Sequence, residues 1–414
     1  MLTVATSRRL VAVALVSLAL ACGAPPAVAA PSIQPVPSTT PGSTRFPETT
    51  GSANPAGGWT ELRWSAPVAT PDRGSLFDVA IWRDGYVAVG QAAVQSQYVG
   101  AAFVSADGLH WERTATLAVN PTRLVVTPTR VVAIGTRVDD ARATRTSVLA
   151  WSARDGRSWQ SEPGLTITDA GVSAATARGE TIVAIGNDAT GASMMWRSVD
   201  AGGWQRVPLA STVVLRGVVS VADGFLAVGR DGEPDQGSGG VGIGGVGRPA
   251  AWWSADGLTW SPAQVEGTPT ARAQLSEVFP VASGYIALGS YATPTSANPR
   301  SPTLWVSVDA HAWRLVGAPP HWPGSLRSNG RQAIVVGVSR ASDGTVTTAA
   351  WVSEDGLQWS PLSFSGDLSN VPVQASEAGG RQPNFDRTFA EPGGILVLGQ
   401  QGGELATWFA AAVH

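Results

Sequence analysis

The chain contains no lysine and a single cysteine, Cys22, among its 414 residues. A lone cysteine excludes an intrachain disulfide framework, so a folded core must be held by apolar packing and hydrogen bonds. The formal net charge of −3 argues against general nucleic-acid binding. Histidine is also scarce, and no His/Cys/carboxylate cluster has metal-ligand spacing. We therefore expect no metal and no cofactor. The four histidines are His110, His311, His321 and His414.

One apolar stretch near the N-terminus predicts export of the protein. Two arginines precede residues 10–21, an apolar segment that is too short to span a membrane but suits the core of a signal peptide. The sequence Ala-Leu-Ala-Cys at 19–22 resembles a bacterial lipobox. We expect residues 1–22 to be a lipoprotein signal peptide and Cys22 to carry the lipid, so that the protein is anchored to the cell membrane outside the cytoplasm. The alternative is cleavage after Ala29 and release of a secreted protein.

Residues 23–57 differ in composition from the rest of the chain. They are rich in proline, serine, threonine and glycine and hold almost no large apolar residues. Such a segment cannot offset the entropy of its own ordering. We expect a disordered tether at 23–57 that leads into a folded domain at 58–414.

Tryptophan recurs along the folded domain at a nearly constant spacing. A repeat of this length accommodates one four-stranded sheet, and sheets repeated in this way are arranged radially in a β-propeller. The pattern therefore predicts an all-β protein, a seven-bladed β-propeller of four-stranded antiparallel blades. The repeated tryptophans are Trp59, Trp111, Trp159, Trp204, Trp260, Trp313 and Trp359.

Two further features mark the repeats. The first is a short apolar run that ends in glycine, as at 85–90, 181–186 and 394–399, which predicts a strand buried on both faces. The second is a polar turn between two aromatic residues, such as the turn 105–108 before Trp111. Asp-Gly between apolar strands predicts a hairpin, because glycine accepts a positive φ and aspartate accepts hydrogen bonds from nearby amides. We expect this hairpin to join the third and fourth strands of a blade. We also expect the repeated tryptophans to pack in the core rather than to stack on a sugar.

The two ends of the folded domain complement each other. The last repeat reaches its third strand at Trp408, and the sequence ends at His414 before a fourth strand. Residues 58–64 resemble a fourth strand that has no repeat of its own. We expect this N-terminal strand to pair into the last blade and close the ring, which would leave no unpaired edge around the circle.

The turn sequence Ser-x-Asp-Gly-x-x-Trp is similar to the Asp-box of the sialidase-like (BNR) propellers. The resemblance covers residues 58–414, with the clearest copies at 105–111, 254–260 and 353–359. In that family the Asp-box is a structural hairpin on the face opposite the binding site, which implies that these aspartates are turn residues here. Weaker copies replace the serine or the glycine by alanine, at Ala153, Ala201 and Ala310.

In six of the repeats, a charged residue lies 10 to 13 positions before the glycine that ends the apolar strand. By analogy with other propellers, ligands meet the face where the innermost strands begin. Four positive and two negative side chains there would form a ring that binds a carboxylate-bearing or phosphorylated ligand through bidentate arginine contacts. The alternative is that they pair with one another around a water-filled channel. The six residues of this inner ring are Asp78, Arg123, Arg216, Glu277, Arg327 and Arg387.

The resemblance also raises sialidase-like hydrolysis as an alternative function. It would require an arginine triad, a tyrosine nucleophile polarised by a glutamate, and an acidic acid/base. Glu277 and Tyr291 fall in one repeat, whereas the tyrosine and glutamate of that family come from different blades. We expect a non-catalytic, membrane-tethered binding or scaffold module, a monomer whose extracellular ligand is an envelope glycan, an anionic small molecule or a protein. A secreted sialidase-like glycoside hydrolase is the alternative.

Overall fold

The structure is a computed structural model, and its described part is built almost entirely of β-strands. Its one described helical element is a 3-10 turn, η1 (Pro71–Arg73). No helix in the described ranges has the length and apolar character needed to cross a membrane. The expected signal peptide, the tether and Cys22 lie outside the described residues. The described residues are 58–95, 97–138, 146–168, 170–199, 203–233, 246–268, 272–292, 300–318, 324–340, 346–366, 373–375, 381–383, 387–401 and 404–413.

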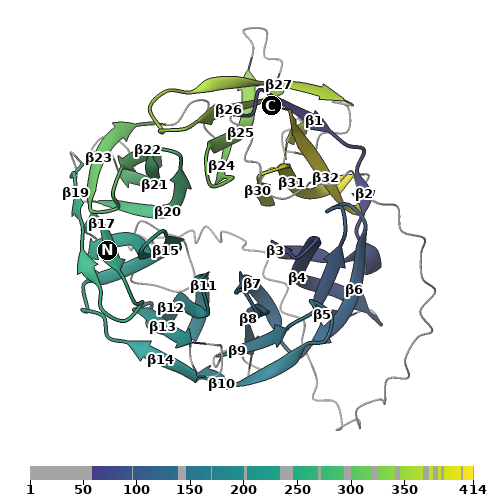
Figure 1. Cartoon of the computed structure of the whole chain (residues 1–414), viewed down its shortest axis with the longest axis horizontal. Helices are drawn as coiled ribbons and strands as arrows, with labels where there is room; N and C mark the ends of the chain where they lie inside the picture. The colour runs from purple at the N-terminus through teal and green to yellow at the C-terminus, as the bar shows by residue number, and fades with distance from the viewer. Residues whose placement is uncertain are drawn as a thin grey trace, which may run out of the picture.

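Antiparallel sheets, most of them four-stranded, stand side by side around a common centre (Figure 1). This radial arrangement is a β-propeller, as the sequence predicts. The innermost strands are β3 (Ser75–Trp82), β7 (Asn120–Val126), β11 (Ala170–Arg178), β15 (Val213–Val221), β20 (Ala273–Val281), β24 (Gly324–Ser328) and β30 (Arg387–Glu391). The second strands are β4 (Gly85–Val94), β8 (Val131–Val138), β12 (Thr181–Asp188), β16 (Gly224–Gly232), β21 (Gly284–Ala292), β25 (Ala333–Arg340) and β31 (Gly394–Gln401).

The remaining strands lie further from the centre. The third strands are β5 (Gln97–Ser105), β9 (Thr146–Ala153), β13 (Ser193–Val199), β17 (Gly247–Ser254), β22 (Arg300–Ser307), β26 (Val346–Ser353) and β32 (Glu404–Val413). The outer strands are β6 (Trp111–Leu117), β10 (Gln160–Thr168), β14 (Gly203–Val207), β18 (Ser261–Pro262), β23 (Ala312–Gly317), β27 (Ser360–Gly366) and β1 (Glu61–Trp64). Four short strands complete the described part: β2 (Val68–Ala69), which pairs with β32, β19 (Gln264–Val265), and the hairpin of β28 (Val373–Ala375) and β29 (Arg381–Pro383).

The second strands carry the apolar runs that end in glycine, and their burial confirms the prediction made for them. In β12, the residues from Ile182 to Gly186 are all buried. Their side chains alternate between the two neighbouring sheets, because successive residues of a strand point to opposite faces. Ile182 belongs to the cluster shared with β8, whereas Ile185 belongs to the cluster shared with β16. Apolar packing between adjacent sheets therefore holds the propeller together.

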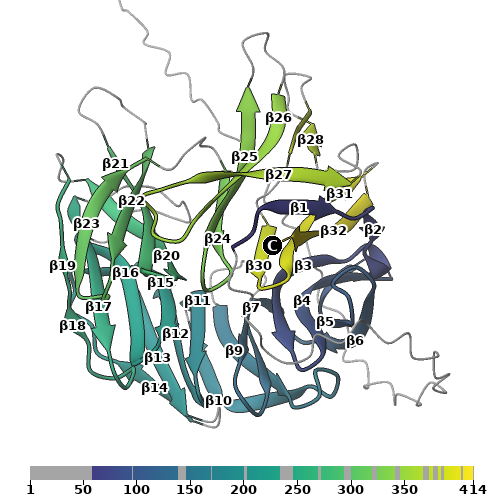
Figure 2. The same cartoon turned by 45° about the horizontal axis from the view of Figure 1, so that its top comes forward.

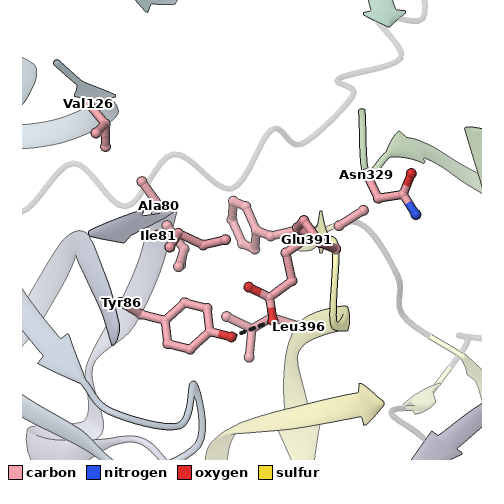
Figure 3. Close-up of a pocket in the computed structure, with 11 residues that line it drawn as sticks. Ala80, Ile81, Tyr86, Val126, Asn329, Glu391 and Leu396 are labelled. Carbon is pink, nitrogen blue, oxygen red and sulfur yellow. Dashed lines mark hydrogen bonds between the residues drawn. The ribbon is translucent and has the colours of Figure 1, made fainter. Parts of the chain in front are cut away.

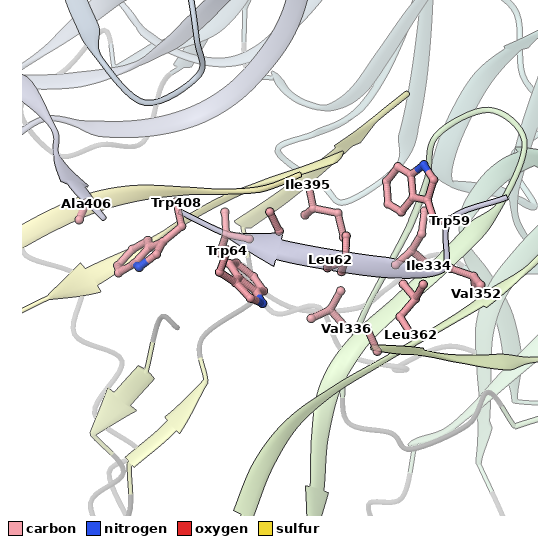
Figure 4. Close-up of a cluster of buried hydrophobic side chains, with 13 residues drawn as sticks. Trp59, Leu62, Trp64, Ile334, Val336, Val352, Leu362, Ile395, Ala406 and Trp408 are labelled. Carbon is pink, nitrogen blue, oxygen red and sulfur yellow. The ribbon is translucent and has the colours of Figure 1, made fainter. Parts of the chain in front are cut away.

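The N-terminal strand pairs with the last strand of the chain. In the antiparallel register of β1 and β32, Leu62 lies opposite Ala412. Trp59 and Trp408 belong to the same buried cluster, which spans β1, β25, β26, β27, β31 and β32 (Figure 4). The backbone carbonyl of Val413 accepts a hydrogen bond from the amide of Thr60 at 2.9 Å. Residues far apart in the sequence therefore share one core.

The outer strand β27 and the short strand β19 also pair with a neighbouring sheet, which the sequence pattern did not predict. The strand β27 leaves β26 and runs parallel to β1, with Leu62 opposite Phe364 (Figure 2). The short strand β19 likewise runs parallel to β23, with Gln264 opposite Ala312. Parallel pairing at the rim covers strand edges that would otherwise be open to other chains.

The Asp-Gly turns are structural hairpins between third and outer strands, as the sequence predicts. Asp256 Oδ1 accepts the backbone amides of Leu258 at 2.8 Å and Thr259 at 2.9 Å. The indole of Trp260 donates to the Gly257 carbonyl at 3.2 Å. Where alanine replaces this glycine, Ala310 still adopts a positive φ of 65°. The turn geometry is thus retained even at a residue that disfavours it.

Burial of the repeated tryptophans is less complete than the sequence led us to expect. Trp59, Trp111 and Trp313 are buried. The other four are only half-buried. These half-buried residues are Trp159, Trp204, Trp260 and Trp359.

Candidate functional site

Five of the innermost strands have a β-bulge near their beginning. The register against the second strand shifts between Leu76 and Asp78 in β3, and between Pro121 and Arg123 in β7. The same shift occurs in β11, β15 and β20. A bulge re-aims the side chains beside it and is common next to functional sites. The bulge could not be predicted from the sequence, because it depends on how the strand pairs with its neighbour.

The bulge sets the positions of the inner-ring residues. Asp78, Arg123 and Glu277 directly follow it, and Arg216 is itself the inserted residue. Arg387 lies opposite Leu398, the residue before the strand-ending glycine, just as Asp78 lies opposite Val89. The side chain of Arg387 is outside the described part of the structure. Arg327 lies two register positions further along an unbulged strand, opposite Ile334. The described members therefore lie at two slightly different levels on the innermost strands, which surround the central channel of a propeller.

Arg123 and Arg327 are held in the same way. Arg123 Nε donates to the Ser173 carbonyl of the next innermost strand at 2.6 Å, and its Nη1 donates to the Thr122 carbonyl at 2.6 Å. Arg327 Nε donates to the Thr388 carbonyl at 2.7 Å, and its Nη1 to the Leu326 carbonyl at 2.6 Å. Each guanidinium thus bridges two strands and has a fixed orientation.

Asp78 also bridges two innermost strands. Its Oδ2 accepts the backbone amide of Leu124 in β7 at 2.8 Å, and its Oδ1 accepts the amide of Val79 at 3.0 Å. Burial raises the pKa of Asp78 to about 6, against the lowering effects of these amides and of the nearby Arg123 and Arg327. The residue as a whole is half-buried by surface area. Both arginines therefore lie within electrostatic range of one carboxyl.

The remaining described members also contact a neighbouring strand. Arg216 Nε donates to Gln274 Oε1 in β20 at 3.3 Å. Glu277 Oε2 lies 3.4 Å from Arg327 Nη1, and this is the one ion pair between described ring members. Glu277 and Tyr291, which fall in one repeat, are not paired in register: Tyr291 lies opposite Ala273, whereas Glu277 lies opposite Leu288. The ring members bond mostly to neighbouring backbone rather than to one another.

A cavity of about 330 Å³ lies at the opposite end of the channel, where the innermost strands end (Figure 3). Its walls come from the ends of β3, β7 and β30 and from the starts of β4 and β31. Tyr86 donates its hydroxyl to Glu391 Oε1 across the junction between the first and last sheets. Sequence reasoning missed this pair, because the two residues are 305 positions apart and no local motif links them.

A wider cavity of about 690 Å³ lies on the same side of the molecule, at the ends of β11, β15 and β20. Its polar lining includes Arg178, Ser220, Ser283 and Tyr285. Arg178 donates Nε and Nη2 to the Ala222 carbonyl at 3.3 and 2.8 Å, so its guanidinium already serves to join two sheets.

Metal binding has no candidate ligand set in the described ranges. No group of three or more histidine, cysteine, aspartate or glutamate residues there could hold a metal ion. Of the histidines, His110 places Nδ1 2.6 Å from Asp107 Oδ2 within an Asp-Gly turn.

No protein-family model matches the sequence, and no curated protein sequence matches it. Among solved structures, the chain is similar to an ulvan lyase bound to GlcA(1-4)Rha3S, with a TM-score of 0.48 and 11% identity over 86% of this chain and 94% of the other. It is similar to the β-propeller domain of the Trilobed protease of Pyrococcus furiosus, with a TM-score of 0.45 and 7% identity over 81% and 93% of the two chains. It is also similar to an α-L-arabinanase of Penicillium chrysogenum in complex with arabinobiose, with a TM-score of 0.40 and 12% identity over 70% of this chain and 98% of the other. The fold of this chain is assigned from its strand pairing.

Proposed function

We propose that this protein is a non-catalytic binding module that takes an anionic ligand at the inner ring. The ligand class is a glycan of the cell envelope that bears carboxylate or phosphate groups. The observation that carries the proposal is the fixed orientation of Arg123 and Arg327 on the channel wall. Each guanidinium has two nitrogens bonded to backbone carbonyls, and Nη2 has no protein partner in the described part of the chain. A donor that is oriented before binding loses little entropy when a ligand arrives.

The charge balance of the described ring favours an anion. Three arginines, Arg123, Arg216 and Arg327, face two carboxyl groups, Asp78 and Glu277. One of these carboxyls has a raised pKa, so it carries less negative charge near pH 6 than an ordinary aspartate. Arginine also matches the planar geometry of carboxylate and phosphate groups better than lysine does.

The proposal includes a closed ring of seven blades of the sialidase-like type, with β1 as the fourth strand of the last blade. Contacts at the junction between the first and last sheets support closure. Leu76 and Phe103 share a buried cluster with Leu396 and Leu398 of β31. Thr407 Oγ1 of β32 also donates to the Leu109 carbonyl at 3.1 Å. A rigid ring keeps the arginines of different sheets at fixed separations.

The proposed location is the outer side of the cell membrane, with a lipid anchor at Cys22. The sequence around the lone cysteine supports this part of the proposal. Treatment of cells with an inhibitor of lipoprotein signal peptidase should accumulate the precursor, and Cys22→Ser should release the protein from the membrane fraction. Unchanged processing and unchanged membrane retention would overturn the anchor.

A glycoside hydrolase of the sialidase-like group is the second candidate, and one contact favours it. Tyr86 and Glu391 form a tyrosine–glutamate hydrogen bond between different sheets, as the resemblance requires. The described lining of their cavity contains no arginine and no second carboxyl group, whereas that chemistry requires an arginine triad and an acid/base. The binding module therefore has the stronger support.

A paired assay on the purified protein separates the two candidates. Oligogalacturonate and a neutral oligosaccharide of equal length are titrated in a calorimeter, and fluorogenic glycosides, sialosides included, are assayed for turnover. The proposal predicts binding of the acidic oligosaccharide, at least about tenfold weaker binding of the neutral one, and no turnover. Turnover that Glu391→Gln abolishes would establish the hydrolase instead. Equal affinity for the two oligosaccharides would overturn an anion-binding ring.

A further inference from the structure

The cavity at the ends of the innermost strands has a lining suited to a small ligand. It holds about 330 Å³, which falls at the lower end of the range for small-molecule sites. The lining is largely apolar, and it includes Val79, Ile81, Phe389 and Leu396. Two polar side chains, Tyr86 and Glu391, meet at one wall (Figure 3).

Glu391 is the charged group of this cavity. Its Oε1 accepts the hydroxyl of Tyr86, which is its one hydrogen-bond partner in the described part of the chain. No described arginine lies in the cavity lining, and no described ion pair includes Glu391. The other charged group that acts on this pair is Asp107, which is also acidic. The carboxyl therefore has no counter-charge from the described residues around it.

The electrostatics of the pair agree with this geometry. Burial raises the pKa of the Glu391 carboxyl, and the hydrogen bond from Tyr86 only partly opposes the increase. Burial likewise raises the pKa of the Tyr86 hydroxyl, and the neighbouring Glu391 carboxyl raises it further. Both shifts show that negative charge is unfavourable in this cavity. A bound cation would relieve that penalty, because an opposite charge nearby favours the ionised form of a carboxyl.

Aromatic rings complete the recognition chemistry. The rings of Tyr86 and Phe389 both line the cavity, and the ring of Tyr86 is held against Trp111, with 6.4 Å between ring centroids. A positively charged ammonium group is attracted to the faces of aromatic rings and to a carboxylate at the same time. We infer that the cavity formed by Tyr86, Phe389 and Glu391 binds a small organic ammonium ion, whose hydrocarbon part lies against Val79, Ile81 and Leu396. This site is separate from the proposed anion site, which lies nearer the beginning of the innermost strands.

Calorimetric titration of the purified protein with matched cations and neutral isosteres tests this inference. The probes are choline and n-butylammonium, and their controls are 3,3-dimethylbutan-1-ol and n-butanol. We expect both cations to bind and the neutral isosteres to bind at least about tenfold more weakly. Neutral isosteres that bind as well as the cations, or cations that do not bind at millimolar concentration, would overturn the inference.

Three variants locate the site. Glu391→Gln keeps an oxygen acceptor for Tyr86 but removes the charge, and we expect it to weaken cation binding about tenfold or more. Tyr86→Phe keeps the ring and releases Glu391 from its hydrogen bond, so cation affinity should stay within about threefold of the native value. Glu112→Gln, on the outer strand β6, is the matched control. Unchanged affinity in a folded Glu391→Gln protein, with folding checked by its thermal unfolding transition, would overturn the assignment to this cavity, as would equal losses in Glu391→Gln and Glu112→Gln.

Discussion

Leu62 of β1 lies opposite Ala412 of β32, and its side chain is completely buried. Leu62→Ala would leave a cavity in the cluster that also holds Trp59 and Trp408. We expect the free energy of unfolding to fall by about 2–5 kcal/mol, measured by urea denaturation. Val316→Ala, on a partly exposed position of β23, is the control and should change it by no more than about 0.5 kcal/mol. Equal losses in the two variants would contradict the role of β1 in joining the ends of the domain.

Asp78 should make the stability of the protein depend on pH. Its pKa in the folded protein, about 6, lies above the ordinary value of 3.8, so the folded protein binds this proton more tightly than the unfolded chain does. The resulting stabilisation is complete below about pH 4 and is lost as the pH rises through about 6. Asp78→Asn retains an oxygen that can accept the Leu124 amide but cannot ionise.

We therefore expect Asp78→Asn to show little pH dependence in this range. The unfolding free energy of the variant minus that of the native protein should therefore increase by about 1–2 kcal/mol between pH 4 and pH 7.5. This value allows for solvent screening at a half-buried site. Urea denaturation at several pH values measures the difference. A difference that stays constant with pH would show that Asp78 does not titrate in this way.

Asp256 should contribute to stability through its turn. Hydrogen bonds from the amides of Thr259 and Leu258 lower the pKa of Asp256, which shows that the ionised form is favoured in the folded protein. Asp256→Ala would leave these amides without their acceptor, and we expect a loss of about 0.5–2 kcal/mol, as for other side chains that cap backbone amides. Asp223→Ala, at an exposed turn of the same sheet, should lose less. Thermal unfolding of the two variants makes the comparison, and a larger loss in Asp223→Ala would contradict the structural role of the turn.

Much of the fold could be predicted from local patterns in the sequence. The spacing of tryptophans such as Trp111 and Trp313, the glycine-ended strands and the Asp-Gly turns each report the conformation of a few neighbouring residues. The pairing of residues 61–64 with the strand at Trp408 could also be predicted. The last repeat has no fourth strand of its own, and the N-terminal residues resemble a fourth strand without a repeat. The parallel pairing of β1 with β27 could not, since it depends on where β27 leaves its own sheet.

The candidate sites were harder to predict. The inner-ring residues were located by counting back from the strand-ending glycines, and this counting placed Arg327 two register positions away from Asp78. It also gave no sign that Arg123 bonds to the backbone of the next strand, because that contact depends on how neighbouring sheets pack. The pair of Tyr86 and Glu391 forms only where the first and last sheets meet. Such contacts are properties of the assembled propeller rather than of any one repeat.

The central claim is that arginines held on the channel wall bind an anion. The most direct test is the calorimetric affinity of the native protein, Arg123→Lys and Arg327→Lys for oligogalacturonate. Lysine keeps the charge but loses the planar donor set and the bond from Nε, so each variant should bind about tenfold more weakly. Arg113→Lys, which alters an arginine paired with Asp72 near the rim, should bind as the native protein does. Native affinity in both channel variants, with folding intact, would contradict the claim.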